Sequence, residues 1–168
     1  MDHSINGLFL SYLKQLSSLV ERVPAPFFDK SLAPDMFSLA MNSKIAANFL
    51  VRGYAPLLEE PGTDINVTDV NEKSAVVAFI NEVKDWLKSQ TRVTTLDDNK
   101  LISERAGHKD TELTQTQFIY QYIIPNFMFH MGMVYAIARS EGVALSKGDF
   151  DGIHWYPKGF SFVDDDGD

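Results

Sequence analysis

Four stretches of the sequence have apolar residues at intervals of three and four positions, the spacing that gathers side chains on one face of an α-helix. They span about residues 5–23, 36–54, 70–89 and 114–141. Pro24 ends the first stretch, Asp35 is placed to cap the second, and Thr114 and Gln117 have the spacing of a capping box at the start of the fourth. Pro125 predicts a bend or a local interruption of that last helix. Four such helices predict an all-α four-helix bundle with cavities between the helices.

Two parts of the chain lie outside this helical pattern. The stretch 91–113 mixes β-branched and polar residues around Gly107, which leaves a long loop and a short hairpin both open before the last helix. Beyond Gly142 the tail 143–168 is rich in aromatic residues, which we expect to pack on the bundle or against a second subunit. We therefore expect a single domain over residues 1–168, with the bundle at about 1–142 and the tail after it.

The composition excludes several kinds of chemistry. The chain of 168 residues contains no cysteine, which excludes disulfides, thiolate zinc sites and cysteine nucleophiles. A net charge of −8 disfavours a nucleic-acid partner, and the apolar runs are shorter than the ~18 residues that a membrane span needs. The first residues lack the features of a signal peptide, so we expect a cytoplasmic protein. The sequence also lacks the glycine patterns of phosphate-binding loops and the serine elbow of hydrolases.

The most distinctive polar residues lie in the fourth helical stretch. Asn126 and His130 are four positions apart, so they share one helix face within an otherwise apolar and aromatic stripe. An imidazole there can bind a metal or act as an acid or a base. The alternative is a core histidine that is hydrogen-bonded to Asn126 or to a carboxylate such as Asp35. We favour this second interpretation, because no other histidine stands at helical spacing from His130.

Several short motifs resemble an uncharacterised bacterial family within the DinB/YfiT-like superfamily. They are Leu32-Ala33-Pro34-Asp35-Met36-Phe37, Pro125-Asn126-Phe127-Met128-Phe129-His130, Tyr135-Ala136-Ile137-Ala138-Arg139, Gly142-Val143 and Lys147-Gly148-Asp149-Phe150. The likeness covers about residues 1–152. It implies a DinB-like up-down-down-up four-helix bundle, a homodimer formed through helix faces and a cavity among the helices.

The resemblance also implies a metal site, from which this sequence departs. Many DinB-like proteins bind a divalent metal through one histidine of the second helix and a His-x-x-x-His pair of the fourth. Here His130 falls at the second position of that pair, Asn126 stands at the first, and the second helix, 36–54, has no histidine. One imidazole of three is present, too few to hold zinc or nickel without further ligands.

Three functional hypotheses follow. The first is a bundle with a degenerate metal site and no cofactor, which binds a small molecule in an inter-helix cavity. Its candidate ligand-binding residues are Asn126, His130, Asp35, Phe37, Met41 and Tyr135. The alternative is a transferase or hydrolase that depends on zinc or nickel, with His130 as a metal ligand joined by Asp35, Asn126 or His108. The third is a structural module with its aromatic tail in a subunit interface.

Overall fold

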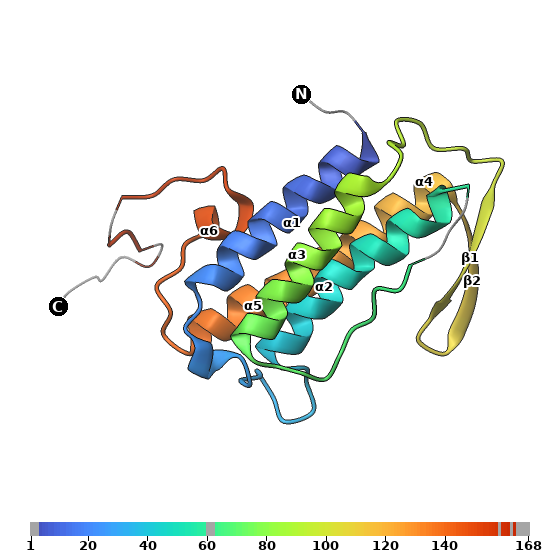
Figure 1. Cartoon of the computed structure of the whole chain (residues 1–168). Coiled ribbons are helices and arrows are strands. Elements are labelled where there is room, and N and C mark those ends of the chain that lie inside the picture. Colours follow the sequence, from blue (N-terminus) through green and yellow to red (C-terminus); the bar gives the residue numbers. More distant parts are fainter. Residues whose placement is uncertain (1–3, 60–62, 158, 162, 164–168) are drawn as a thin grey trace.

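The computed structural model describes residues 4–59, 63–157, 159–161 and 163. Its bundle consists of α1 (Ile5–Arg22), α2 (Leu39–Tyr54), α3 (Lys73–Ser89) and α5 (Ile124–Ser140). In the bundle α3 packs against both α1 and α2, and α2 packs extensively on α5. Figure 1 shows that α2 and α3 run in one direction while α1 and α5 run in the other. The extended connection between α2 and α3 makes this possible, because it returns the chain to the end of the bundle where α2 began.

The first helix agrees with its sequence pattern, whereas the second begins later than predicted. The Ser4 hydroxyl caps α1 by accepting from the Gly7 N–H at 3.0 Å, and α1 ends just before Pro24. The prediction that Asp35 caps α2 is wrong. Ser38 is the cap, since its hydroxyl accepts from the Met41 N–H at 3.2 Å, and Asp35 lies in an exposed turn before it.

The prediction of an all-α chain is wrong. The stretch before the last helix contains a two-stranded antiparallel hairpin, β1 (Leu101–Ala106) and β2 (Lys109–Thr114), paired from Leu101 with Thr114 to Ala106 with Lys109. Gly107 opens the two-residue turn with φ +63°, a conformation that glycine adopts without strain. Ile102 is buried, and the hairpin lies at one end of the bundle (Figure 1).

The last long helix is interrupted where proline predicted a disturbance. Thr114 and Gln117 form the expected capping box at the start of the short helix α4 (Gln115–Gln117). A π-helical segment, Phe118–Ile123, follows and leads directly into α5. At the end of this segment the Ile124 N–H donates to the Ile119 carbonyl, five residues back. The residue after Ile124 is Pro125, whose nitrogen has no hydrogen to donate.

The C-terminal part only partly packs on the bundle. The short helix α6 (Lys147–Asp151) contacts α1, and the Phe150 ring meets Tyr135 edge-on with centroids 6.0 Å apart. Trp155, in contrast, is 81% exposed, so this ring does not pack on the bundle, and its packing against a second subunit stays a prediction. Phe162 lies outside the described residues.

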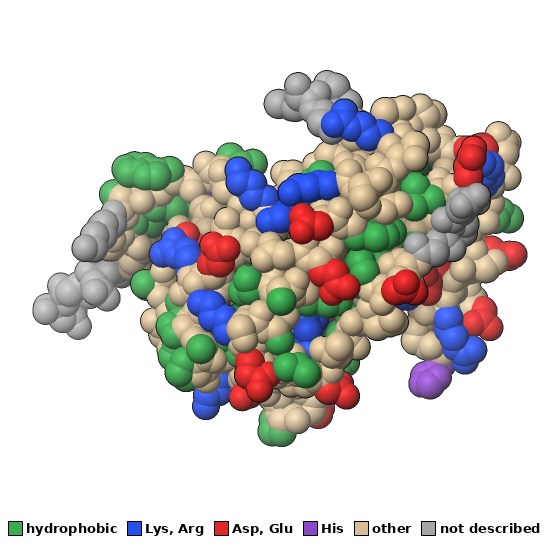
Figure 2. Space-filling view, viewed as in Figure 1, with side chains coloured by type: hydrophobic (Ala, Val, Ile, Leu, Met, Phe, Trp, Pro, Cys, Tyr) green, Lys and Arg blue, Asp and Glu red, His purple; other side chains and the backbone are tan. Residues whose placement is uncertain are grey.

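The surface combines charges of both signs. Figure 2 shows acidic and basic side chains interspersed with apolar ones over the visible face of the bundle. Among the residues that the structure describes, no helix has the length and hydropathy needed to cross a membrane.

Candidate functional site

A buried polar pair, Asn42 with His130, joins α2 to α5. Asn42 lies in the first turn of α2 and is 2% exposed, while His130 lies in the second turn of α5 and is 8% exposed. The distance between His130 Nδ1 and Asn42 Oδ1 is 2.9 Å. Since these residues are 88 positions apart, the pair depends on the packing of α2 against α5.

The surroundings of Asn42 decide which nitrogen of His130 holds the proton. Asn42 Nδ2 donates to the carbonyls of Phe37 and Ser38 at 2.9 and 3.0 Å, so its Oδ1 must be the atom that faces the imidazole. A carbonyl oxygen only accepts, and His130 Nδ1 therefore donates. In the neutral ring the Nε2 atom then has a free lone pair.

Burial keeps this imidazole neutral. Desolvation lowers the pKa of His130 below its ordinary value of 6.5, because a charged ring would lose its hydration. Across the described part of the chain, Nε2 makes no hydrogen bond. The site thus presents one uncharged acceptor that Asn42 holds in a fixed tautomer and orientation, as the partners of catalytic and metal-bound histidines do.

Aromatic rings surround the imidazole. Phe49 stacks on it with centroids 5.7 Å apart and planes at 22°, and Phe129 meets it edge-on at 5.1 Å. Phe129 is itself 54% exposed, so one wall of the site reaches the surface. Such walls favour an apolar or aromatic molecule beside the single polar acceptor.

The other candidate residues are more dispersed than the sequence indicated. Asn126 Nδ2 donates to the Tyr122 carbonyl of its own helical turn at 2.7 Å. The expected hydrogen bond of His130 with Asn126 or Asp35 is replaced by the one that His130 Nδ1 donates to Asn42. Phe37 precedes α2 and is 57% exposed, Met41 is half-buried, and Tyr135 contacts Phe150. Asn42 was missed, although it is a polar residue within the apolar pattern of the second helix.

The residues at this site do not fit a zinc or nickel centre. The described residues include no group of three histidine, aspartate or glutamate side chains that could hold a metal ion. His130 is accompanied by amides, and the oxygen of Asn42 already accepts from Nδ1. His108 lies in the exposed turn of the hairpin. An imidazole with neutral amide oxygens is a weak ligand set for either metal.

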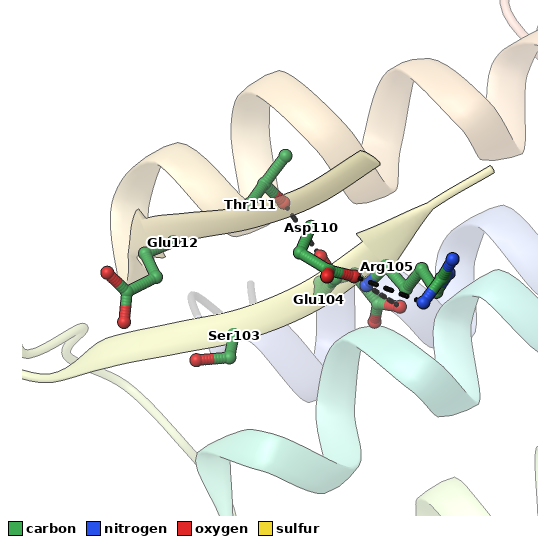
Figure 3. A pocket seen from close by; sticks show the side chains of 6 residues that line it. All are labelled: Ser103, Glu104, Arg105, Asp110, Thr111 and Glu112. Carbon is green, nitrogen blue, oxygen red and sulfur yellow. Dashed lines mark hydrogen bonds and ion pairs between the residues drawn. The ribbon is translucent and has the colours of Figure 1, made fainter. Parts of the chain in front are cut away.

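Two surface hollows involve the hairpin. One, of about 640 Å³, extends over both strands and is lined by Ser103, Glu104, Arg105, Asp110, Thr111 and Glu112 (Figure 3). Arg105 and Asp110 face each other there at 3.6 Å, so their charges offset each other. The other hollow lies between β1 and α2, where Glu104 binds Arg52.

The fold is that of the DinB-like proteins. It is similar to the crystal structure of a DinB family member protein from Shewanella denitrificans, with a TM-score of 0.72, 22% sequence identity and coverage of 93% of each chain. Residues 8–151 match the family model described as Domain of unknown function (DUF1993), and the chain belongs to that family. The resemblance noted in the sequence is thus confirmed. No curated protein matches the chain.

Proposed function

We propose that this chain binds a small, mostly apolar molecule with an O–H or N–H group, and that His130 Nε2 accepts the hydrogen bond of that group. The hydrogen bond between His130 Nδ1 and Asn42 Oδ1 is the observation that supports this proposal. It fixes the tautomer in which Nε2 is an acceptor, and the lowered pKa of His130 keeps the ring from becoming a charged donor.

The aromatic neighbours favour a ligand of matching chemistry. Phe49 and Phe129 offer a ring face and a ring edge beside the acceptor. A site of this kind selects for the donor group, because an analogue without it leaves the acceptor unsatisfied. Phenols and indoles combine the required ring with one donor.

Phenol and anisole form a matched pair of probes for this proposal. Anisole keeps the ring but has lost the O–H group. Two-bond proton–nitrogen NMR spectra of the free protein should show Nδ1 protonated and Nε2 unprotonated, and phenol should shift the Nε2 signal at concentrations where anisole does not. A protonated Nε2, or equal responses to the two probes, would contradict the proposal.

The alternative is a transferase or hydrolase that uses a divalent metal at His130. The set of one imidazole and neutral amides argues against it. Elemental analysis of protein purified without chelator or metal resin tests this alternative. Near-stoichiometric zinc or nickel that is lost in His130→Ala would favour the metalloenzyme over the ligand-binding protein.

A homodimer and a cytoplasmic location remain predictions. Phe37 and Phe129 are both more than half exposed, and each adjoins the Asn42–His130 pair, so a second copy that covered them would also enclose the site. Sedimentation over a range of concentrations measures the oligomeric state.

A further inference from the structure

A hollow of about 400 Å³ lies between α2, residues 63–67 and β1, and His130 is not among the residues that line it. Its apolar lining comes from Val51, Ala55, Pro56, Ile65 and Val67. Its charged lining residues are Arg52 and Glu104. A hollow of this size accommodates a molecule with a single ring.

Three contacts hold the guanidinium of Arg52 in place. Its Nη2 donates to Glu104 Oε1 at 2.7 Å and to the Tyr122 hydroxyl at 3.2 Å. Its central carbon lies 4.8 Å from the centroid of the Phe49 ring. The side chain is therefore already ordered before any ligand arrives, which reduces the entropy that binding would cost.

Polar atoms on both partners stay available to a ligand. In the described residues, Arg52 Nε and Nη1 make no hydrogen bond, and neither does Glu104 Oε2. The pair thus offers donors from the guanidinium next to an acceptor from the carboxylate. Because the two charges offset each other, the pair favours a neutral ligand over an anion.

We propose that this hollow is a second binding site, which takes a neutral planar carboxamide or lactam. The ligand carbonyl accepts from Arg52, the ligand N–H donates to Glu104 Oε2, and its ring lies against the apolar lining. An ionised carboxylate lacks this complementarity, since it has no donor for Glu104. The site involves neither His130 nor Asn42.

Benzamide and N,N-dimethylbenzamide are the probes that test this proposal on the full chain. The dimethyl compound keeps the ring and the carbonyl but has no N–H. In proton–nitrogen correlation spectra, benzamide should shift the amide signals of Asn48, Asn66 and Val67, with a dissociation constant below about 10 mM. Shifts that cluster elsewhere, an absence of shifts, or equal responses to the two probes would overturn the proposal.

Variants then locate the interaction on Arg52. Arg52→Lys keeps the charge but loses the planar donor fork, and it should weaken benzamide binding at least tenfold. Arg105→Lys is the matched control, because Arg105 follows Glu104 on β1 and pairs with Asp110 instead. His130→Gln should leave benzamide binding unchanged, whatever becomes of phenol binding. Unchanged affinity in Arg52→Lys would refute the proposal, and if that variant does not fold, the wild-type spectra still decide.

Discussion

Replacing Asn42 by alanine tests whether the amide sets the tautomer of His130. The substitution leaves the buried Nδ1–H without an acceptor, which costs about 1–3 kcal/mol. It also removes two hydrogen bonds to the Phe37 and Ser38 carbonyls at the start of α2, while alanine returns roughly 0.5 kcal/mol of helix propensity. We expect a net loss of about 2 kcal/mol in the free energy of unfolding, or roughly 4–8 °C in Tm.

Asn48→Ala is the matched control for this experiment. Asn48 lies on the same helix and has no side-chain hydrogen bond among the described residues, so its replacement should be neutral or slightly stabilising. Denaturant unfolding measures the free energy, and nitrogen NMR measures the His130 tautomer. In Asn42→Ala the proton should become shared between Nδ1 and Nε2. If the two variants agreed in stability within about 0.5 kcal/mol and the tautomer stayed fixed, Asn42 would have no orienting role.

Three further predictions concern ionisable groups. Because the folded-state pKa of His130 is lowered, the unfolded chain binds more protons below pH 6.5. Wild-type stability should therefore fall more steeply than that of His130→Gln as the pH is lowered through 6.5, and parallel curves from denaturant unfolding would contradict this. Lys44 is buried, and its ammonium group donates to the carbonyls of Thr68 and Val70. Lys44→Met should therefore speed amide exchange in residues 63–72, which mass spectrometry can measure. Unchanged exchange would mean that Lys44 does not hold this segment in place. The Asp151 carboxyl should titrate with a pKa of about 2 by carbon NMR, and should stay low in His154→Ala because backbone N–H groups are the main cause.

The long helices were predictable because their apolar patterns are strong, but local boundaries were not. Asp35 and Ser38 are both suitable caps, and Phe37 continues the apolar spacing before the helix begins. The turn in which the Met36 N–H bonds the Ala33 carbonyl at 3.0 Å excludes Asp35 from the helix start, so that Ser38 becomes the cap. A choice between two adequate caps depends on how the preceding chain packs.

The hairpin was less predictable because its strands contribute little to the core. Ile102 is the buried residue of β1, and most other positions are polar or charged. One contact that ties the hairpin to the bundle is the ion pair between Glu104 and Arg52, two residues 52 positions apart. Pairs at such separation leave no periodic signal in the sequence.

The candidate site was predictable only in part, for a similar reason. His130 could be recognised as an imidazole within an apolar stripe, and burial of such a residue implies a hydrogen-bonding partner. Its partner could not be identified, since Asn126, four residues away, bonds the backbone of its own helix while Asn42 arrives from another helix. The sequence therefore identified His130 as a candidate polar residue, whereas its partner Asn42 could be identified only from the packing of α2 against α5.

Stability alone does not account for an imidazole and an amide in the α2–α5 interface. Phe127, Met131 and Val134 bury apolar side chains on the same helix as His130. A leucine at position 130 would add to that apolar surface without the desolvation cost of a polar ring. Asn42 and His130 each satisfy the buried polar group of the other, so removing one leaves the other without its partner. The double variant Asn42→Ala/His130→Leu should therefore lose about 1 kcal/mol less free energy of unfolding than the two single variants lose together. Additive losses would mean that the two side chains are independent, whereas coupling would show that the Nδ1–Oδ1 hydrogen bond makes each side chain depend on the other.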